Sequence, residues 1–266
     1  MKLRWLSLKL RWLSLKLRWL SLKLRWLSLK LRWLSLSKPP FAGVQIFMID
    51  MIEGFKKCGI PESIAEALAA KMEAYIKEII LFNSAYNLTN TSNRDELVVR
   101  HIFDSLVAWP KIAELAGGPV VLADIGSGGG LPGIPLAAAF SLLPEFNDVR
   151  FELVERMEKR CAFLENCAAI LSLKNVTVVN SEAEHLPQEA YNLITFRAFR
   201  PLDKKMAKTL LRIVKPQGYL CAYKAKLENI KEEMSAITGL VPDYEVQPLH
   251  VPGLEDSERN LVLIKK

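Results

Sequence analysis

Residues 123–135 constrain the fold of this chain more than any other stretch, because they join an apolar run to a cluster of glycines. The apolar residues 120–123 predict a buried parallel strand. Asp124 ends that strand, and glycines follow at positions 126, 128, 129 and 130. Glycine permits a sharp turn and lets backbone N–H groups approach a ligand closely. Since Pro132 is well placed to open a helix, the pattern predicts a strand, a glycine turn and a helix. This is the layout of a nucleotide-type cofactor site at the carboxyl edge of a parallel sheet.

The spacing of the glycines bears on which cofactor binds. The dinucleotide fingerprint Gly-x-Gly-x-x-Gly, started at Gly126, needs a third glycine at position 131, where the chain has Leu131. Gly128 and Gly130 instead give a Gly-x-Gly-x-Gly spacing with an acid two residues earlier. That spacing favours the loop that binds S-adenosyl-L-methionine in class I methyltransferases. Asp124 is then a candidate for holding the ammonium group of the methionine end.

Polar residues after three later strands are candidates for the same site. Glu155 ends the second predicted strand and could accept both ribose hydroxyls of an adenosine. NAD enzymes use the same contact, so Glu155 supports an adenosine cofactor without choosing between the two. Ala183 and Glu184 follow the third strand, where methyltransferases contact adenine, although a solvated acidic loop is an equal alternative. Arg197 ends the fourth strand, and we interpret it as facing the cleft.

The chain after residue 40 divides into two predicted segments. Residues 41–116 show helical periodicity, with helices at 62–82 and from position 95 onward, and form a small helical subdomain. Residues 117–266 alternate between strands and helices and form the methyltransferase domain. The predicted fold is a Rossmann-like, doubly wound α/β sheet with a terminal antiparallel hairpin, typical of class I methyltransferases. After the first strand, its strands are predicted at Val149–Glu155, 175–179, 192–196, 219–223, 244–251 and 261–264.

The N-terminal 40 residues are a separate feature. Five identical copies of Lys-Leu-Arg-Trp-Leu-Ser-Leu run from Lys2 to Leu36, and they form neither a single apolar helical face nor a regular strand. We interpret residues 1–40 as a duplicated tail and linker outside the functional fold, which a start at Met48 or Met51 would omit. The formal charge of +7 originates here: without the ten Lys and Arg of residues 1–36, 26 basic residues remain against 29 acidic ones. Any RNA contact by the rest of the chain therefore needs a local basic patch.

The types of reactive side chain narrow the chemistry further. The fourth strand is followed by neither the Asn/Asp-Pro-Pro-Tyr/Phe motif of amino methyltransferases nor the cysteine nucleophile of C5-pyrimidine enzymes. Guanine N7 already bears a lone pair, so its methylation needs chiefly positioning and electrostatics. The three histidines lack metal-ligand spacing, and the four cysteines are read as reduced thiols of a cytoplasmic protein. No stretch is long and uncharged enough to span a bilayer.

Several sequence blocks together resemble one family. They are Asn83-x-x-Tyr86-Asn87-Leu88-Thr89, Arg100-His101-Ile102-x-Asp104-Ser105-Leu106, Asp124-Ile125-Gly126-Ser127-Gly128-x-Gly130-Leu131-Pro132-Gly133-Ile134-Pro135, Lys159-Arg160-x-x-Phe163-Leu164 and Arg197-Ala198-Phe199. The set resembles the RsmG (GidB) family of 16S ribosomal RNA methyltransferases and covers roughly residues 48–266. The resemblance implies transfer of a methyl group from S-adenosyl-L-methionine to guanine N7 in the 530 loop of 16S ribosomal RNA.

The resemblance also implies roles for single residues. Cofactor contacts fall on Gly126, Leu131, Ala183, Glu184 and Arg197. Four residues match basic or polar family positions that could face RNA. Of these, Lys159 and Arg160 are the RNA-binding candidates, and His101 and Lys224 are substrate-positioning candidates. Arg197 is a third substrate-positioning candidate.

The chain also departs from the family pattern. Glu182 stands where the family usually has Arg, and Ala225 stands where a glycine commonly follows the lysine, here Lys224. The Glu182 departure puts a basic RNA or cofactor contact at that position in doubt.

The implied partner is 16S ribosomal RNA or the small ribosomal subunit. We expect a monomer without a metal or a membrane partner. A non-catalytic RNA-binding ribosome assembly factor, an NAD-linked oxidoreductase and a small-molecule methyltransferase are the alternatives.

Overall fold

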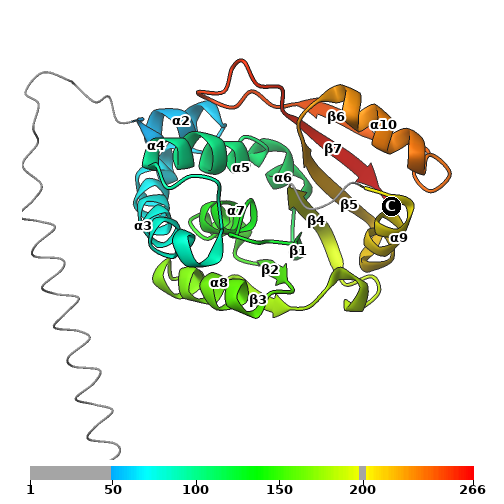
Figure 1. Ribbon diagram of the computed structural model, residues 1–266, viewed down its shortest axis with the longest axis horizontal. Helices are drawn as coiled ribbons and strands as arrows, with labels where there is room; N and C mark the ends of the chain where they lie inside the picture. Colours follow the sequence, from blue (N-terminus) through cyan, green and yellow to red (C-terminus); the bar gives the residue numbers. More distant parts are fainter. Residues whose placement is uncertain (1–48, 198–201) are drawn as a thin grey trace, which may run out of the picture. The chain divides into compact units, whose positions relative to one another are not determined.

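The computed structural model describes residues 49–197 and 202–266, which lie within the unit Met48–Lys266 (Figure 1). The predictions for the repeat tail at 1–40, for residues 41–48 and for Ala198 and Phe199 fall outside the described residues. Among the helices of the two described ranges, none combines the length and the apolar character that a membrane span requires.

One sheet of seven strands, in the order β3-β2-β1-β4-β5-β7-β6, organises the described residues (Figure 1). In chain order the strands are β1 (Val120–Ile125), β2 (Val149–Glu155), β3 (Val176–Asn180), β4 (Tyr191–Arg197), β5 (Val214–Lys224), β6 (Glu245–Pro248) and β7 (Asn260–Lys265). The first five strands are parallel, whereas β7 pairs antiparallel with both β5 and β6. This order with a reversed β7 is that of class I methyltransferases, so the predicted fold class is confirmed.

Helices cover both faces of this sheet. The segments before and between the strands are α2 (Met51–Lys57), α3 (Glu62–Tyr86), α4 (Arg94–Leu97), the π-helix η1 (Val98–Phe103), α5 (Asp104–Leu106), α6 (Trp109–Leu115), α7 (Gly133–Phe140), the 3-10 helix η2 (Pro144–Phe146), α8 (Glu158–Ile170), the 3-10 helix η3 (Ala183–His185), α9 (Lys204–Ile213) and α10 (Leu227–Ile237). Residues of α2, α3, α6, α7 and α8 share one hydrophobic core with one face of the sheet, and α9 and α10 share a second core with the other.

The two cores explain the continuous apolar run before the glycines. Successive side chains of a strand point to opposite faces, so Leu122 enters the first core while Ala123 enters the second. Leu153 and Val154 divide in the same way on β2. Coverage on both faces therefore accounts for the consecutive apolar residues at 120–123, as expected for a parallel sheet.

Helix ends follow local chemistry. Asp203 caps α9 because its carboxylate accepts a hydrogen bond from the backbone N–H of Met206 at 2.8 Å. That helix ends at Ile213, and β5 starts at Val214, five residues before the predicted position 219. Pro216 explains the shift, because the residue before a proline disfavours helical backbone angles. The helix α10 and the π-helical form of residues 98–103 were not predicted.

Candidate active site

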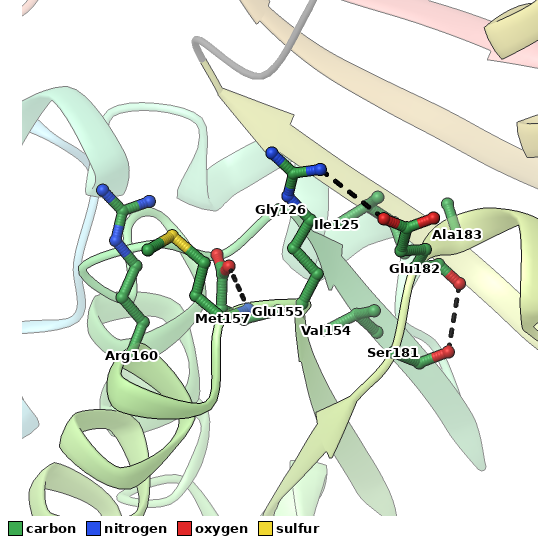
Figure 2. A pocket seen from close by; sticks show the side chains of 10 residues that line it. Ile125, Gly126, Val154, Glu155, Met157, Arg160, Ser181, Glu182 and Ala183 are labelled. Atoms are coloured by element: carbon green, nitrogen blue, oxygen red, sulfur yellow. Dashed lines mark hydrogen bonds and ion pairs between the residues drawn. The ribbon is translucent and has the colours of Figure 1, made fainter.

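A cavity of about 300 Å³ opens at the carboxyl ends of β1 and β2 and beside the turn after β3 (Figure 2). It occupies the edge at which doubly wound sheets bind their ligands. The residues that line it are Ile125, Gly126, Val154, Glu155, Arg156, Met157, Arg160, Ser181, Glu182 and Ala183. The cavity therefore brings together Gly126, Glu155 and Ala183, three of the predicted cofactor contacts, and Arg160, a predicted RNA contact.

Glu155 connects the glycine loop to the end of β2. One carboxylate oxygen accepts a hydrogen bond from the N–H of Gly128 at 3.0 Å, and the other accepts from the N–H of Met157 at 2.9 Å. The residue is 5% exposed and lines the cavity. Because each carboxylate oxygen has a second lone pair, Glu155 retains acceptor capacity for a ligand.

Asp124 lies beneath the glycine loop and does not line the cavity. It is 1% exposed, and its carboxylate accepts from the Ser127 hydroxyl at 2.7 Å, the Gly133 N–H at 3.1 Å and the Thr195 hydroxyl at 3.2 Å. Burial raises the pKa of Asp124 to about 6, although these hydrogen bonds oppose the rise. The arrangement ties β1, the loop and the start of α7 together.

The glycines of the loop serve backbone geometry and close packing. Gly130 has a φ of +89°, and a Cβ added there would lie 2.6 Å from Cγ1 of Ile134. An L side chain is therefore excluded twice at this position, by conformation and by space. Leu131, predicted as a cofactor contact, is buried and is not among the residues that line the cavity.

The segment predicted to contact adenine is held by an arginine that the sequence did not single out. Arg212, in the last turn of α9, donates hydrogen bonds to the carbonyls of Leu186 at 2.9 Å, Glu184 at 3.1 Å and Ala183 at 3.4 Å. These bonds fix η3 against α9. Ala183 lines the cavity, whereas Glu184 does not. A lone arginine in an amphipathic helix carries no sequence signal for this role.

Glu182, the residue that departs from the family pattern, pairs with Arg156 across the cavity mouth. Their charged atoms lie 3.5 Å apart, and the Arg156 and Glu182 side chains are 65% and 42% exposed. Such an exposed pair contributes at most about 1 kcal/mol to stability.

Arg197 and His101 meet beside the cavity, not in its lining. Arg197 forms an ion pair with Asp104 at 2.7 Å, and the other Asp104 oxygen accepts from Arg259 at 3.0 Å. A second Arg197 nitrogen lies 3.2 Å from Nδ1 of His101. Burial and the Arg197 charge lower the pKa of His101 to about 4. The imidazole is therefore neutral at pH 7, and with Nδ1 assigned as the acceptor from Arg197, Nε2 carries the proton.

The remaining predicted residues are dispersed. Lys224 pairs with Glu233 at 2.6 Å, and its ammonium lies 6.0 Å from the Phe196 ring centroid. Lys159 is exposed at the start of α8. Arg160 lines the cavity and donates to the Asn87 carbonyl at 3.2 Å, and its buried Nε has no hydrogen-bond partner within the described ranges.

The four cysteines are free and buried. Burial raises the pKa of both Cys58 and Cys221 to about 12 and raises that of Cys167 and Cys161 as well. None is a thiolate at pH 7, as the reading without a cysteine nucleophile requires. No cluster of three metal-ligating side chains occurs in the part of the chain that the structure describes.

Comparison with known proteins identifies the family. The family model GidB, described as rRNA small subunit methyltransferase G, matches residues 68–262. The chain belongs to this methyltransferase G family. A relative named "Ribosomal RNA small subunit methyltransferase G" from Treponema denticola is 39% identical over 239 residues, covering 81% of this chain and 93% of the relative. One of the same name from Treponema pallidum strain Nichols is 42% identical over 200 residues, covering 75% and 86%.

Family membership bears on the predictions made from the sequence. It confirms the resemblance drawn from the sequence blocks and does not favour an NAD-linked oxidoreductase. Among solved structures, one match is a SAM dependent methyltransferase from Aquifex aeolicus, with 18% identity, a TM-score of 0.47 and coverage of 65% of this chain and 93% of that chain.

Proposed function

We propose that this chain transfers the methyl group of S-adenosyl-L-methionine to N7 of a guanine in the 530 loop of 16S ribosomal RNA. The observation that carries the proposal is the junction of the glycine loop and Glu155 at one cavity, in a chain of the methyltransferase G family. The names of the two Treponema relatives support the small-subunit ribosomal RNA as the substrate class.

The residues around the cavity suit this cofactor. A volume of about 300 Å³ lies within the range of small-molecule sites. We assign the ribose hydroxyls to Glu155, the adenine to the Ala183–Glu184 segment and the methionine end to the glycine loop at Gly126 and Gly128. Asp124 then acts through the loop, since its oxygens are already occupied by Ser127, Gly133 and Thr195. When bound, the cofactor supplies an electrophilic methyl group on a positively charged sulfur.

The substrate side needs donors and no strong base. Guanine presents N7 and O6 as acceptors on one edge, and N7 must stay free to receive the methyl group. We assign the recognition of O6 to the donors beside the cavity, Arg197 and the neutral His101, with Lys224 as a further candidate. Holding the base in line with the methyl group accounts for catalysis by positioning and electrostatics.

The RNA backbone needs local positive charge, because residues 37–266 carry 26 basic against 29 acidic side chains. Lys159 and Arg160 at the start of α8 are our candidates for phosphate contacts. Such a protein works in the cytoplasm, and we propose that it acts as a monomer without a metal ion.

A methylation assay tests the proposal. The full-length protein is incubated with methyl-labelled cofactor and either small subunits or naked 16S RNA that lacks the modification, and the label is mapped by mass spectrometry. We expect 7-methylguanine at one position of the 530 loop with at least one of the two substrates. Label at another base, or on no RNA at all, would refute the proposal.

Two variants sharpen this assay. Glu155→Gln removes a charged acceptor, so the KM for the cofactor should rise by about 10- to 100-fold, as expected for hydrogen bonds to charged groups. Glu158→Ala, an exposed acid at the start of the neighbouring helix α8, is the matched control and should behave as the unmodified chain.

A further inference from the structure

The glycine loop accepts a hydrogen bond from a tyrosine that lies far away in the sequence. Tyr75 lies in the middle of α3, is fully buried, and donates its phenolic hydroxyl to the backbone carbonyl of Gly129. Burial raises the pKa of Tyr75 well above its ordinary value, so the hydroxyl keeps its proton at physiological pH. A helix that precedes the sheet thus contacts the loop that follows β1.

The peptide between Gly129 and Gly130 is fixed at both ends. Tyr75 holds its carbonyl, and its N–H, which belongs to Gly130, donates to the carbonyl of Ser127 at 2.7 Å. On another side, Leu88 approaches so closely that a Cβ on Gly129 would lie 3.3 Å from the Leu88 carbonyl oxygen. Leu88 is itself positioned by Asn83 at the end of α3, whose side-chain oxygen accepts from the Leu88 N–H at 2.9 Å.

One N–H group of the loop stands apart from the others. The N–H groups of Gly126, Ser127, Gly128, Gly130 and Leu131 all donate within the protein. The N–H of Gly129 has no hydrogen-bond partner among residues 49–197 and 202–266, although the residue is buried. Buried backbone N–H groups without a partner are rare in folded proteins, but Gly129 does not line the cavity, whereas Gly126 at the start of the same loop does.

We infer that Tyr75 is a positioning residue for the cofactor: by holding the Gly129 carbonyl, it fixes the glycine loop whose Gly126 lines the cavity and whose Gly128 donates to Glu155. The inference rests on the proposed use of the loop for S-adenosyl-L-methionine. Tyr75→Phe retains the ring in the core and removes only the hydroxyl. The Gly129 carbonyl then loses its donor and the loop gains freedom, which weakens cofactor binding.

Calorimetry and kinetics on the full-length chain test this inference. For Tyr75→Phe we expect about tenfold weaker binding of S-adenosyl-L-methionine, as for one buried hydrogen bond. The kcat at saturating cofactor and the KM for RNA should stay within about twofold, because the hydroxyl touches neither substrate.

Tyr191→Phe is the matched control. Tyr191 is also a buried tyrosine, and its hydroxyl donates to the Glu152 carboxylate at 2.7 Å. It is the first residue of β4 and therefore lies at the amino end of that strand, away from the carboxyl edge where the cavity opens. It should lose stability without losing cofactor affinity. Equal affinities of Tyr75→Phe and the unmodified chain, or an equal loss in the control, would overturn the inference.

Two further outcomes are separable. If the unmodified chain itself fails to bind the cofactor, the proposed function fails rather than the role of Tyr75. If Tyr75→Phe does not fold, Asn83→Ala removes the acceptor that positions the Leu88 backbone against the other side of Gly129, and cofactor affinity unchanged by that substitution would contradict the positioning of Gly129.

Discussion

Replacing Asp124 by asparagine isolates the free-energy cost of ionising the buried carboxylate beneath the glycine loop. Burial raises its pKa from 3.8 to about 6 in the folded chain. Each pKa unit corresponds to about 1.4 kcal/mol, so the ionised form costs the folded state about 3 kcal/mol relative to the protonated form. Since the folded pKa is the higher one, this contribution to stability is complete below pH 3.8 and is lost as the pH rises through 6.

Asparagine at position 124 is neutral at every pH and nearly the same shape. Its oxygen can accept from Ser127 and Gly133, and its amide can donate to the Thr195 hydroxyl. The free energy of unfolding of Asp124→Asn, minus that of the unmodified chain, should therefore increase by about 2.4 kcal/mol between pH 4 and pH 7. Urea unfolding followed by circular dichroism measures this difference, in which the other titrating groups cancel. A difference that does not change with pH would refute the reasoning.

The same variant decides how Asp124 serves the cofactor. If the acid acts only by bracing the loop, Asp124→Asn should bind S-adenosyl-L-methionine within about threefold of the unmodified chain. A direct contact with the ammonium group of the cofactor would instead cost about 10- to 100-fold. Calorimetry at pH 8, where the carboxylate is ionised, separates the two.

Three further substitutions test the surrounding geometry. Gly130→Ala should destabilise the fold by roughly 3 kcal/mol or more in urea unfolding, because it adds a clash to a strained φ; a loss below about 1 kcal/mol would contradict the packing described. Arg212→Gln should raise the KM for the cofactor about tenfold, because the Ala183 segment loses its donors; an unchanged KM would remove η3 from the adenine site. Asp104→Ala leaves the partly buried Arg197 without its ion-pair partner and should cost about 2–3 kcal/mol in thermal or urea unfolding, and a neutral effect would show that the pair is solvated.

The fold was predictable from the sequence where a continuous or alternating apolar run marks a strand. The predicted and observed limits of β2 agree at both ends, Val149 and Glu155. The prediction missed α10 and the start of β5. In α10, acidic residues are interspersed with only three buried apolar ones, Ile230, Met234 and Ile237. The first residues of β5 continue the helical pattern of the preceding residues. The π-helix at 98–103 has an ordinary helical sequence, which does not distinguish it from an α-helix.

The site was predictable to the extent that its chemistry lies at strand ends. Glu155 ends β2 and the glycines begin directly after β1, and the parallel topology brings those ends together. Two helical residues that contact the same site have no such signal. Tyr75 lies 54 residues before Gly129, and Arg212 lies 29 residues after Ala183, and no spacing rule connects such positions. The sequence likewise could not show that Asp124 is buried beneath the loop. An acid at the end of a strand gives the same sequence pattern whether its carboxylate binds a ligand or, as here, accepts from the Ser127 and Thr195 hydroxyls.

Methylation of the 530 loop by this chain can be tested in the cell that encodes it. The 16S RNA of a strain that lacks the gene is mapped by mass spectrometry beside that of the parent strain and of the deletion strain complemented with the full-length gene. We expect 7-methylguanine in the 530 loop to disappear on deletion and to return on complementation. The same modification persisting unchanged in the deletion strain would contradict it.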